Sequence, residues 1–94
     1  MYKFYRTPNF ERDVKRCLKK HRDMNEFKAA VVAVLNSDTT PIPLSFNDHA
    51  LKGSLQGKRE LHIGGRKSDW LIIYSRENEV VGFERTGTHD ELYR

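Results

Sequence analysis

Residues 59–89, RELHIGGRKSDWLIIYSRENEVVGFERTGTH, carry the strongest strand signals in the chain. Two dense apolar runs, Trp70–Tyr74 and Val80–Phe83, are rich in the β-branched and aromatic residues that favour strands. Residues 75–79 between them are polar and can turn. This stretch therefore predicts two consecutive strands joined by a turn.

A third strand is predicted just before these two, over residues 59–63. Alternation along it places Leu61 and Ile63 on one side, and Glu60 and His62 on the other. The apolar side is expected to face the core. We therefore place His62 on the open face of the sheet.

Polar side chains gather at the ends of these strands. His62 precedes the first apolar run, and Asp69 opens it. Arg85 and His89 follow the second run, and His49 lies upstream in a loop. Arg85 shares the alternation of the apolar residues before it, and we place it at the strand's end, beyond the core. Imidazoles, a carboxylate and a guanidinium that converge from strand ends can move protons around a phosphate.

The N-terminal half predicts one strand and two helices. Residues 2–6 alternate aromatic and basic side chains, as in a strand. Apolar residues recur at helical spacing over residues 9–21 and again over 25–37, where Asn9 and Asn25 can cap the helices. The second helix is apolar round most of its circumference and is expected to be buried.

The predicted element order is β-α-α-β-β-β. It gives an α+β fold in which two helices pack on one face of a four-stranded sheet. We expect a single small domain over residues 1–94. Thr88 and Glu91 have the spacing of a capping box, which predicts a short terminal helix.

The chain is moderately basic, with 17 Lys and Arg against 13 Asp and Glu and a net charge of +4. Such a charge is compatible with a polyanionic partner such as nucleic acid. Four basic residues share one stripe on the first predicted helix: Arg12, Lys15, Arg16 and Lys19. This stripe is either a solvated outer face or a surface that docks on phosphates.

Other features exclude several classes of protein. Cys17 is the only cysteine, so neither an internal disulfide nor a thiolate metal cage can form. The His and Asp residues lie at scattered spacings with no H-x-x-x-H pair, so we expect no metal and no cofactor. No apolar run approaches the ~20 residues of a membrane span, and residues 1–4 lack the pattern of a signal peptide. We expect a soluble, cytoplasmic protein.

Several short motifs resemble one known family. They are K-K-H-R-D-M-N at 19–25, D-H-A-L-K-G at 48–53, D-W-L-I-I-Y at 69–74 and F-E-R-T-G-T-H at 83–89. Together with a strand that ends in His62, they resemble the YafQ-type branch of the RelE/ParE toxin superfamily. The resemblance runs over most of the chain, and the predicted element order is that of the family fold.

This resemblance implies a type II toxin that cuts mRNA in the ribosomal A site without a metal and is silenced by a cognate antitoxin. The implied catalytic residues are His49, His62, Asp69, Arg85 and His89. Trp70, a core aromatic by pattern alone, and Tyr93, which stands where the family has Phe, are implied to contact the substrate. The basic stripe would then face the ribosome. One departure is the connector of six residues, 63–68, which is longer than the family's usual one.

Two other functions stay open at this point. A ParE-like toxin shares the fold but acts on DNA gyrase without a histidine cluster, and the three aligned histidines argue against it. A non-catalytic RNA-binding module would need the basic stripe but not the Asp and His set. Cutting RNA through its own 2′-OH needs a base, an acid and a cation for the phosphate, and the His and Arg residues can supply all three.

Overall fold

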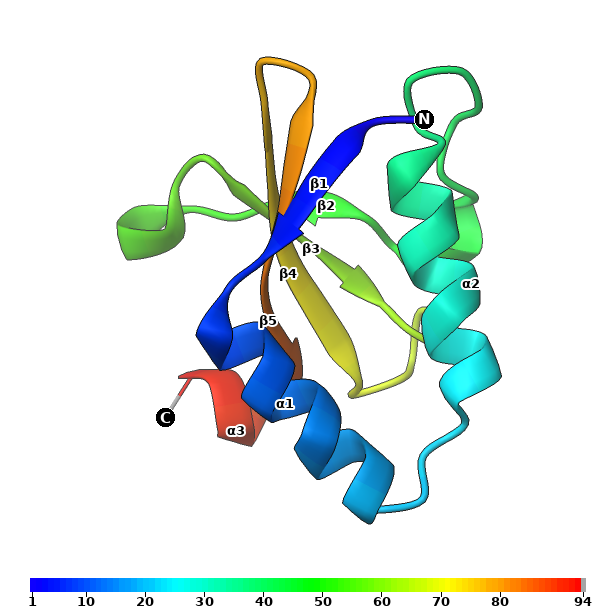
Figure 1. Ribbon diagram of the computed structural model, residues 1–94, viewed down its shortest axis with the longest axis vertical. Coiled ribbons are helices and arrows are strands. Elements are labelled where there is room, and N and C mark those ends of the chain that lie inside the picture. Colours follow the sequence, from blue (N-terminus) through cyan, green and yellow to red (C-terminus); the bar gives the residue numbers. More distant parts are fainter. Residues whose placement is uncertain (94) are drawn as a thin grey trace.

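The computed structural model describes residues 1–93 and shows one mixed sheet of five strands in the order β1-β5-β4-β3-β2, with α1 and α2 on one face (Figure 1). The strands are β1 (Lys3–Arg6), β2 (His49–Ala50), β3 (Lys58–His62), β4 (Leu71–Glu77) and β5 (Val80–Gly87). The helices are α1 (Pro8–Lys19), α2 (Met24–Leu35) and α3 (His89–Tyr93), with short 3-10 turns at Leu44–Phe46 and Gly53–Leu55. The predicted α+β class and element order are confirmed.

The fifth strand, β2, is an addition to the predicted sheet. It spans only His49 and Ala50, which pair antiparallel with Glu60 and Arg59 of β3. Two residues are too few to show an alternation in the sequence, so His49 was assigned to a loop. Pairing with β3, rather than local pattern, makes this segment a strand.

Both long helices begin two residues earlier than their expected caps. The Thr7 side chain accepts the N–H of Phe10 at 3.0 Å, with Pro8 in the first turn, so Thr7 caps α1. Asp23 caps α2 by accepting the N–H of Asn25 at 3.0 Å. None of the helices over residues 1–93 is long and apolar enough to cross a membrane.

The core lies between the sheet and the two helices, and aromatic rings tie the layers together. Phe10 of α1 lies 5.9 Å from Phe27 of α2 and 5.5 Å from Phe83 of β5, measured between ring centroids. The expectation that α2 is buried nearly all round was wrong, because Val32 on its outer side is 48% exposed. Only the stripe facing the sheet is covered, as in an ordinary amphipathic helix.

The β4–β5 hairpin turns more tightly than expected. Only Asn78 and Glu79 lie between the strands, and both have positive φ, of 51° and 65°. Two left-handed residues form the loop type that matches the twist of antiparallel strands. Residues 75–77, expected in the turn, therefore extend β4.

Side chains of α1 form hydrogen bonds with the backbone of β5 where this strand has no neighbouring strand. β1 pairs in parallel with β5 only as far as Phe83. Beyond that point the Asp13 carboxylate accepts the N–H of Thr86 at 3.0 Å, and Arg16 donates to the Thr86 carbonyl at 3.2 Å. Asp13 is only 2% exposed and also accepts from Arg85 Nε at 2.7 Å. This carboxylate fixes α1 against the sheet.

A β-bulge in β5 decides where its polar residues point. Tyr74 of β4 pairs with Phe83, but the next residue back, Ile73, pairs with Arg85. Glu84 is therefore an extra residue that reverses the alternation after it. Arg85 leaves the face of Phe83, which resolves the conflict that its sequence position posed.

We expect Asp13→Ala to destabilise the fold by about 2–3 kcal/mol, because a buried acceptor with backbone and guanidinium donors is lost. The matched control is Glu11→Ala on the same helix, whose ion pair with Arg6 is largely exposed and is worth about 0.5 kcal/mol or less. Chemical denaturation of both variants measures the difference. Equal effects would show that Asp13 does not anchor α1.

Candidate active site

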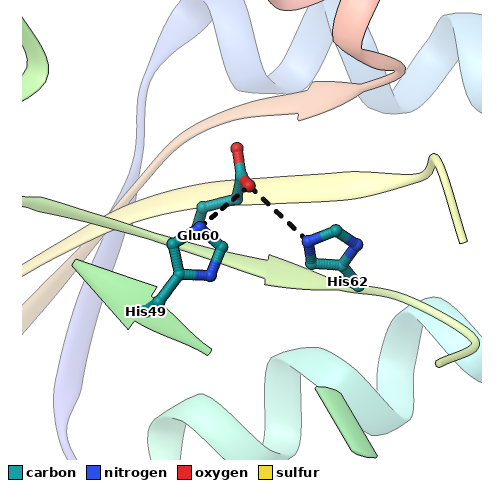
Figure 2. A group of neighbouring side chains, drawn as sticks. All are labelled: His49, Glu60 and His62. Atoms are coloured by element: carbon teal, nitrogen blue, oxygen red, sulfur yellow. Dashed lines mark ion pairs between the residues drawn. The ribbon is translucent and has the colours of Figure 1, made fainter. Parts of the chain in front are cut away.

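Two imidazoles from neighbouring strands converge on one buried carboxylate (Figure 2). His49 lies on β2, and Glu60 and His62 lie on β3. Oε2 of Glu60 is 3.2 Å from Nε2 of His49 and 3.6 Å from Nε2 of His62. The Glu60 side chain is 5% exposed, whereas that of His49 is 42% exposed. The cluster therefore has a buried floor and an open side toward solvent.

Backbone carbonyls fix the orientation of both rings. His49 Nδ1 lies 2.7 Å from the Asn47 carbonyl, and His62 Nδ1 lies 2.8 Å from the Ser68 carbonyl. A carbonyl oxygen only accepts, so Nδ1 of each ring carries the proton in these contacts. In both rings Nε2 is then the atom that faces Glu60.

Tyr93 of α3 closes the cluster from the other side. Its hydroxyl donates to Oε1 of Glu60 at 2.5 Å, the oxygen that the imidazoles leave free. Burial raises the pKa of Tyr93, and the hydrogen bond to Glu60 raises it further. The phenol is therefore a fixed donor at neutral pH, and it holds the carboxylate in place.

The third imidazole, His89, is the first residue of α3. The capping box places it there, since Thr88 N–H donates to the Glu91 carboxylate at 2.9 Å and Thr88 Oγ1 accepts the Glu91 N–H at 3.2 Å. Nδ1 of His89 contacts Oδ1 of Asp69 at 2.6 Å. This hydrogen bond lowers the pKa of Asp69. The carboxylate thus orients the ring and leaves Nε2 free.

The three imidazoles form a row with Tyr93. Ring centroids are 6.0 Å apart for His49 and His62, 6.3 Å for His62 and His89, and 5.6 Å for His89 and Tyr93. The long connector does not disturb this row, because Ile63 N–H still bonds the Trp70 carbonyl at 2.7 Å beyond it. Asp69 is brought to His89, and not to the nearer residue in sequence, His62.

Arg85 reaches the same face of the sheet because of the bulge at Glu84. Directly opposed residues run across the strands in one row: His49, Glu60, Ile73 and Arg85. Opposed residues of neighbouring strands point to the same face. Arg85 holds Asp13 through Nε at 2.7 Å and Nη2 at 3.3 Å, and this pairing raises the pKa of the guanidinium. Its Nη1 takes no part in these bonds.

Trp70 lies beneath the site. Its ring is 5% exposed, stacks on Phe27 at 5.8 Å and donates from Nε1 to Thr86 Oγ1 at 3.2 Å. The guanidinium of Arg22 lies 4.8 Å above the ring centroid. A supporting role is what this burial shows for Trp70, and its contact with the substrate stays a prediction.

The basic stripe is only partly free on the surface. Arg12, Lys15 and Lys19 are exposed, and Arg12 bonds Asn9 on its own helix. Arg16 turns inward, where it meets Asp13 at 3.0 Å and Glu91 of α3 at 2.9 Å. Lys20 bonds the same Glu91 and lowers the pKa of that carboxyl to about 2. Arg16, whose side chain is 36% exposed, therefore also fastens α3 to α1.

Sequence reasoning missed two residues on which the site depends, Glu60 and Asp13. Glu60 alternates onto the same side of its strand as His62, and this spacing was a usable signal. Asp13 gave no such signal, because an acidic residue among lysines and arginines on a helix is typical of a solvated face.

Comparison with known proteins places the chain in a family. It matches the family described as "Bacterial toxin of type II toxin-antitoxin system, YafQ" over residues 2–94. The chain belongs to the YafQ family of bacterial toxins. It is similar to the mRNA interferase toxin YafQ of Escherichia coli K12, with 39% identity over 84 residues that cover 89% of this chain and 87% of that protein.

Solved structures of YafQ-family toxins and their relatives share the fold. The YafQ chain of the E. coli DinJ–YafQ complex has a TM-score of 0.87 and 35% identity, with all of both chains covered. A metal-bound toxin from Helicobacter pylori has a TM-score of 0.85 and 27% identity, covering 99% of this chain and all of that one. The sheet, helices and site described above are therefore carried on a toxin scaffold.

Proposed function

We propose that this toxin is a ribosome-dependent mRNA endonuclease that cuts mRNA in the ribosomal A site. The observation that carries the proposal is the row of His49, His62 and His89, with ring spacings of 6.0 and 6.3 Å. The strand register places Arg85 on the same side of the sheet. Imidazoles so placed can act together on one phosphate. The name of the E. coli relative, an mRNA interferase toxin, supports the same reaction.

The reaction needs two proton transfers and no metal. A base removes the proton of the 2′-OH, the 2′ oxygen attacks the adjacent phosphorus, and an acid protonates the departing 5′ oxygen. The products are a 2′,3′-cyclic phosphate and a 5′-hydroxyl. We assign the base to His89, because Asp69 binds its Nδ1 and leaves Nε2 able to accept a proton.

The acid is one of the two imidazoles beside Glu60, those of His49 and His62. An anionic carboxylate 3.2 Å from His49 and 3.6 Å from His62 stabilises a protonated imidazole that can then donate to the leaving oxygen. Arg85 stabilises the charge that gathers on the phosphate. Its Nη1 is available for this, because Asp13 takes only Nε and Nη2.

Substrate and ribosome contacts surround this row. Tyr93 is 42% exposed beside His89 and can stack on a base next to the cut bond. The exposed basic residues of α1, Arg12, Lys15 and Lys19, are suited to ribosomal RNA phosphates. The reaction would take place in the cytoplasm, where translating ribosomes are found.

A cognate antitoxin is the second partner that we propose. The E. coli relative forms a complex with DinJ, and a nuclease acting on translating ribosomes has to be kept inactive in its host. A ParE-like inhibitor of DNA gyrase and a non-catalytic RNA-binding module remain the alternatives. Neither would use the His and Asp pairing seen at Asp69 and His89.

Wild-type protein added to translating ribosomes should produce new mRNA ends inside the A site. His89→Ala should cut at least about a hundredfold more slowly, because the base is gone. It should still sediment with ribosomes. His21→Asn, at an exposed histidine that is not part of the row, should cut normally. A chelator selective for transition metals, which leaves ribosomal Mg²⁺ in place, should not slow wild-type cutting.

The other outcomes identify the alternatives. Bound but intact mRNA would favour the RNA-binding module, and inhibited gyrase would favour the ParE-like toxin. Full cleavage by ribosome-bound His89→Ala would remove this residue from the chemistry. Loss of cutting on transition-metal chelation would overturn the metal-independent reaction.

Charge reversal on α1 tests the ribosome contact. The double variant Lys15→Glu, Lys19→Glu should bind ribosomes more weakly and with a shallower dependence on salt, because fewer phosphates are neutralised. The control carries the same change of charge at two exposed lysines elsewhere, Lys28→Glu and Lys52→Glu. If both double variants lose affinity equally, net charge alone explains the effect and the stripe is a solvated face.

A further inference from the structure

His49, Glu60 and His62 bring three electron-pair donors together. The Asn47 and Ser68 carbonyls engage Nδ1 of the two rings, so in each neutral ring Nε2 bears a lone pair. Both lone pairs face the same anionic oxygen of Glu60, at 3.2 and 3.6 Å (Figure 2). These three electron-pair donors repel one another unless a positive centre lies between them. The proton of the proposed acid is one such centre, and a metal ion is another.

The two distances to the Glu60 oxygen match those between neighbouring ligands of a divalent transition metal ion. Bonds of about 2.0–2.1 Å in a tetrahedral arrangement place neighbouring ligand atoms about 3.3 Å apart. The two distances to Glu60 bracket that value, and all three donor atoms lie within 4.8 Å of one another. Two histidines and one glutamate form a ligand set that zinc accepts while keeping a fourth position open.

The surroundings of the three ligands are those of a built site. Both imidazoles donate their other N–H to a backbone carbonyl, and the free oxygen of Glu60 is held by the Tyr93 hydroxyl. Such outer contacts fix the tautomer and the ring orientation of metal ligands. The partly exposed ring of His49 leaves a path from solvent to the fourth position.

We propose that His49, Glu60 and His62 bind a Zn²⁺-like divalent ion, and that the bound ion reversibly inhibits the toxin. The ion would occupy both Nε2 lone pairs, so neither ring could carry the proton that the leaving oxygen needs. Binding rests on the geometry of this cluster alone. Inhibition rests also on the proposed nuclease function. Mg²⁺, which prefers oxygen ligands, should not compete for two imidazoles.

His89 allows metal binding to be separated from catalysis. Its Nδ1 is engaged by Asp69 and it does not belong to the three-ligand cluster. Removing the His89 ring should therefore slow cutting about a hundredfold and leave the metal site intact. Removing the His49 ring should weaken the metal site directly.

Titration calorimetry of the purified, metal-free full chain with Zn²⁺ tests the binding. The wild type should bind one equivalent, and His49→Ala and Glu60→Gln should each weaken binding by about tenfold or more. His89→Ala should bind as the wild type does. His21→Asn, which removes a surface histidine at a position with φ of 57° that Asn tolerates, is the control for unspecific binding. No binding, or equal binding by His49→Ala, would overturn the site.

Cleavage of ribosome-bound mRNA with added Zn²⁺ tests the inhibition. Cutting should fall as the site fills and return when a transition-metal chelator is added. Peptide synthesis by the same ribosomes without the toxin reports any effect of Zn²⁺ on the ribosome itself. Binding of Zn²⁺ with no change in cutting would overturn the inhibitory role. Cutting that occurs only with Zn²⁺ would overturn both that role and the metal-independent reaction, while leaving the site in place.

Discussion

A single buried carboxylate, that of Glu60, holds the site together. Its two oxygens meet groups from three elements: His49 of β2, His62 of its own strand and Tyr93 of α3. A buried anion is costly without a donor or a positive charge beside it, which the Tyr93 hydroxyl supplies and the imidazoles supply when they are protonated. The carboxylate thereby links the edge strand β2, its neighbour β3 and the terminal helix α3.

The other half of the site depends on how β5 ends. The bulge at Glu84 turns Arg85 onto the face of Glu60, and Asp13 fixes both the guanidinium and the strand edge. The strand then leads directly into α3, whose first residue is His89. One extra residue, Glu84, and one ion pair, between Asp13 and Arg85, thus determine which side of the sheet the end of β5 presents to the site.

Local patterns predicted much of this from sequence. The apolar runs of the central strands and the capping box that places His89 are properties of neighbouring residues, and both are found in the structure. The bulge, the partners of Asp13 and the pairing of β2 depend on contacts between distant segments, so no local pattern could predict them. Trp70 shows the same limit, because its burial is decided by Phe27 and Thr86, which lie far away in the chain.

The role of Glu60 is tested most directly by the rate at which Glu60→Gln cuts ribosome-bound mRNA in a single turnover. The amide keeps the size of the side chain but removes the charge that stabilises a protonated imidazole. We predict a fall of about tenfold or more, with folding and ribosome binding retained. Glu84→Gln, a half-buried carboxylate on the same sheet, should cut normally. A wild-type rate for Glu60→Gln would contradict the central role of this carboxylate.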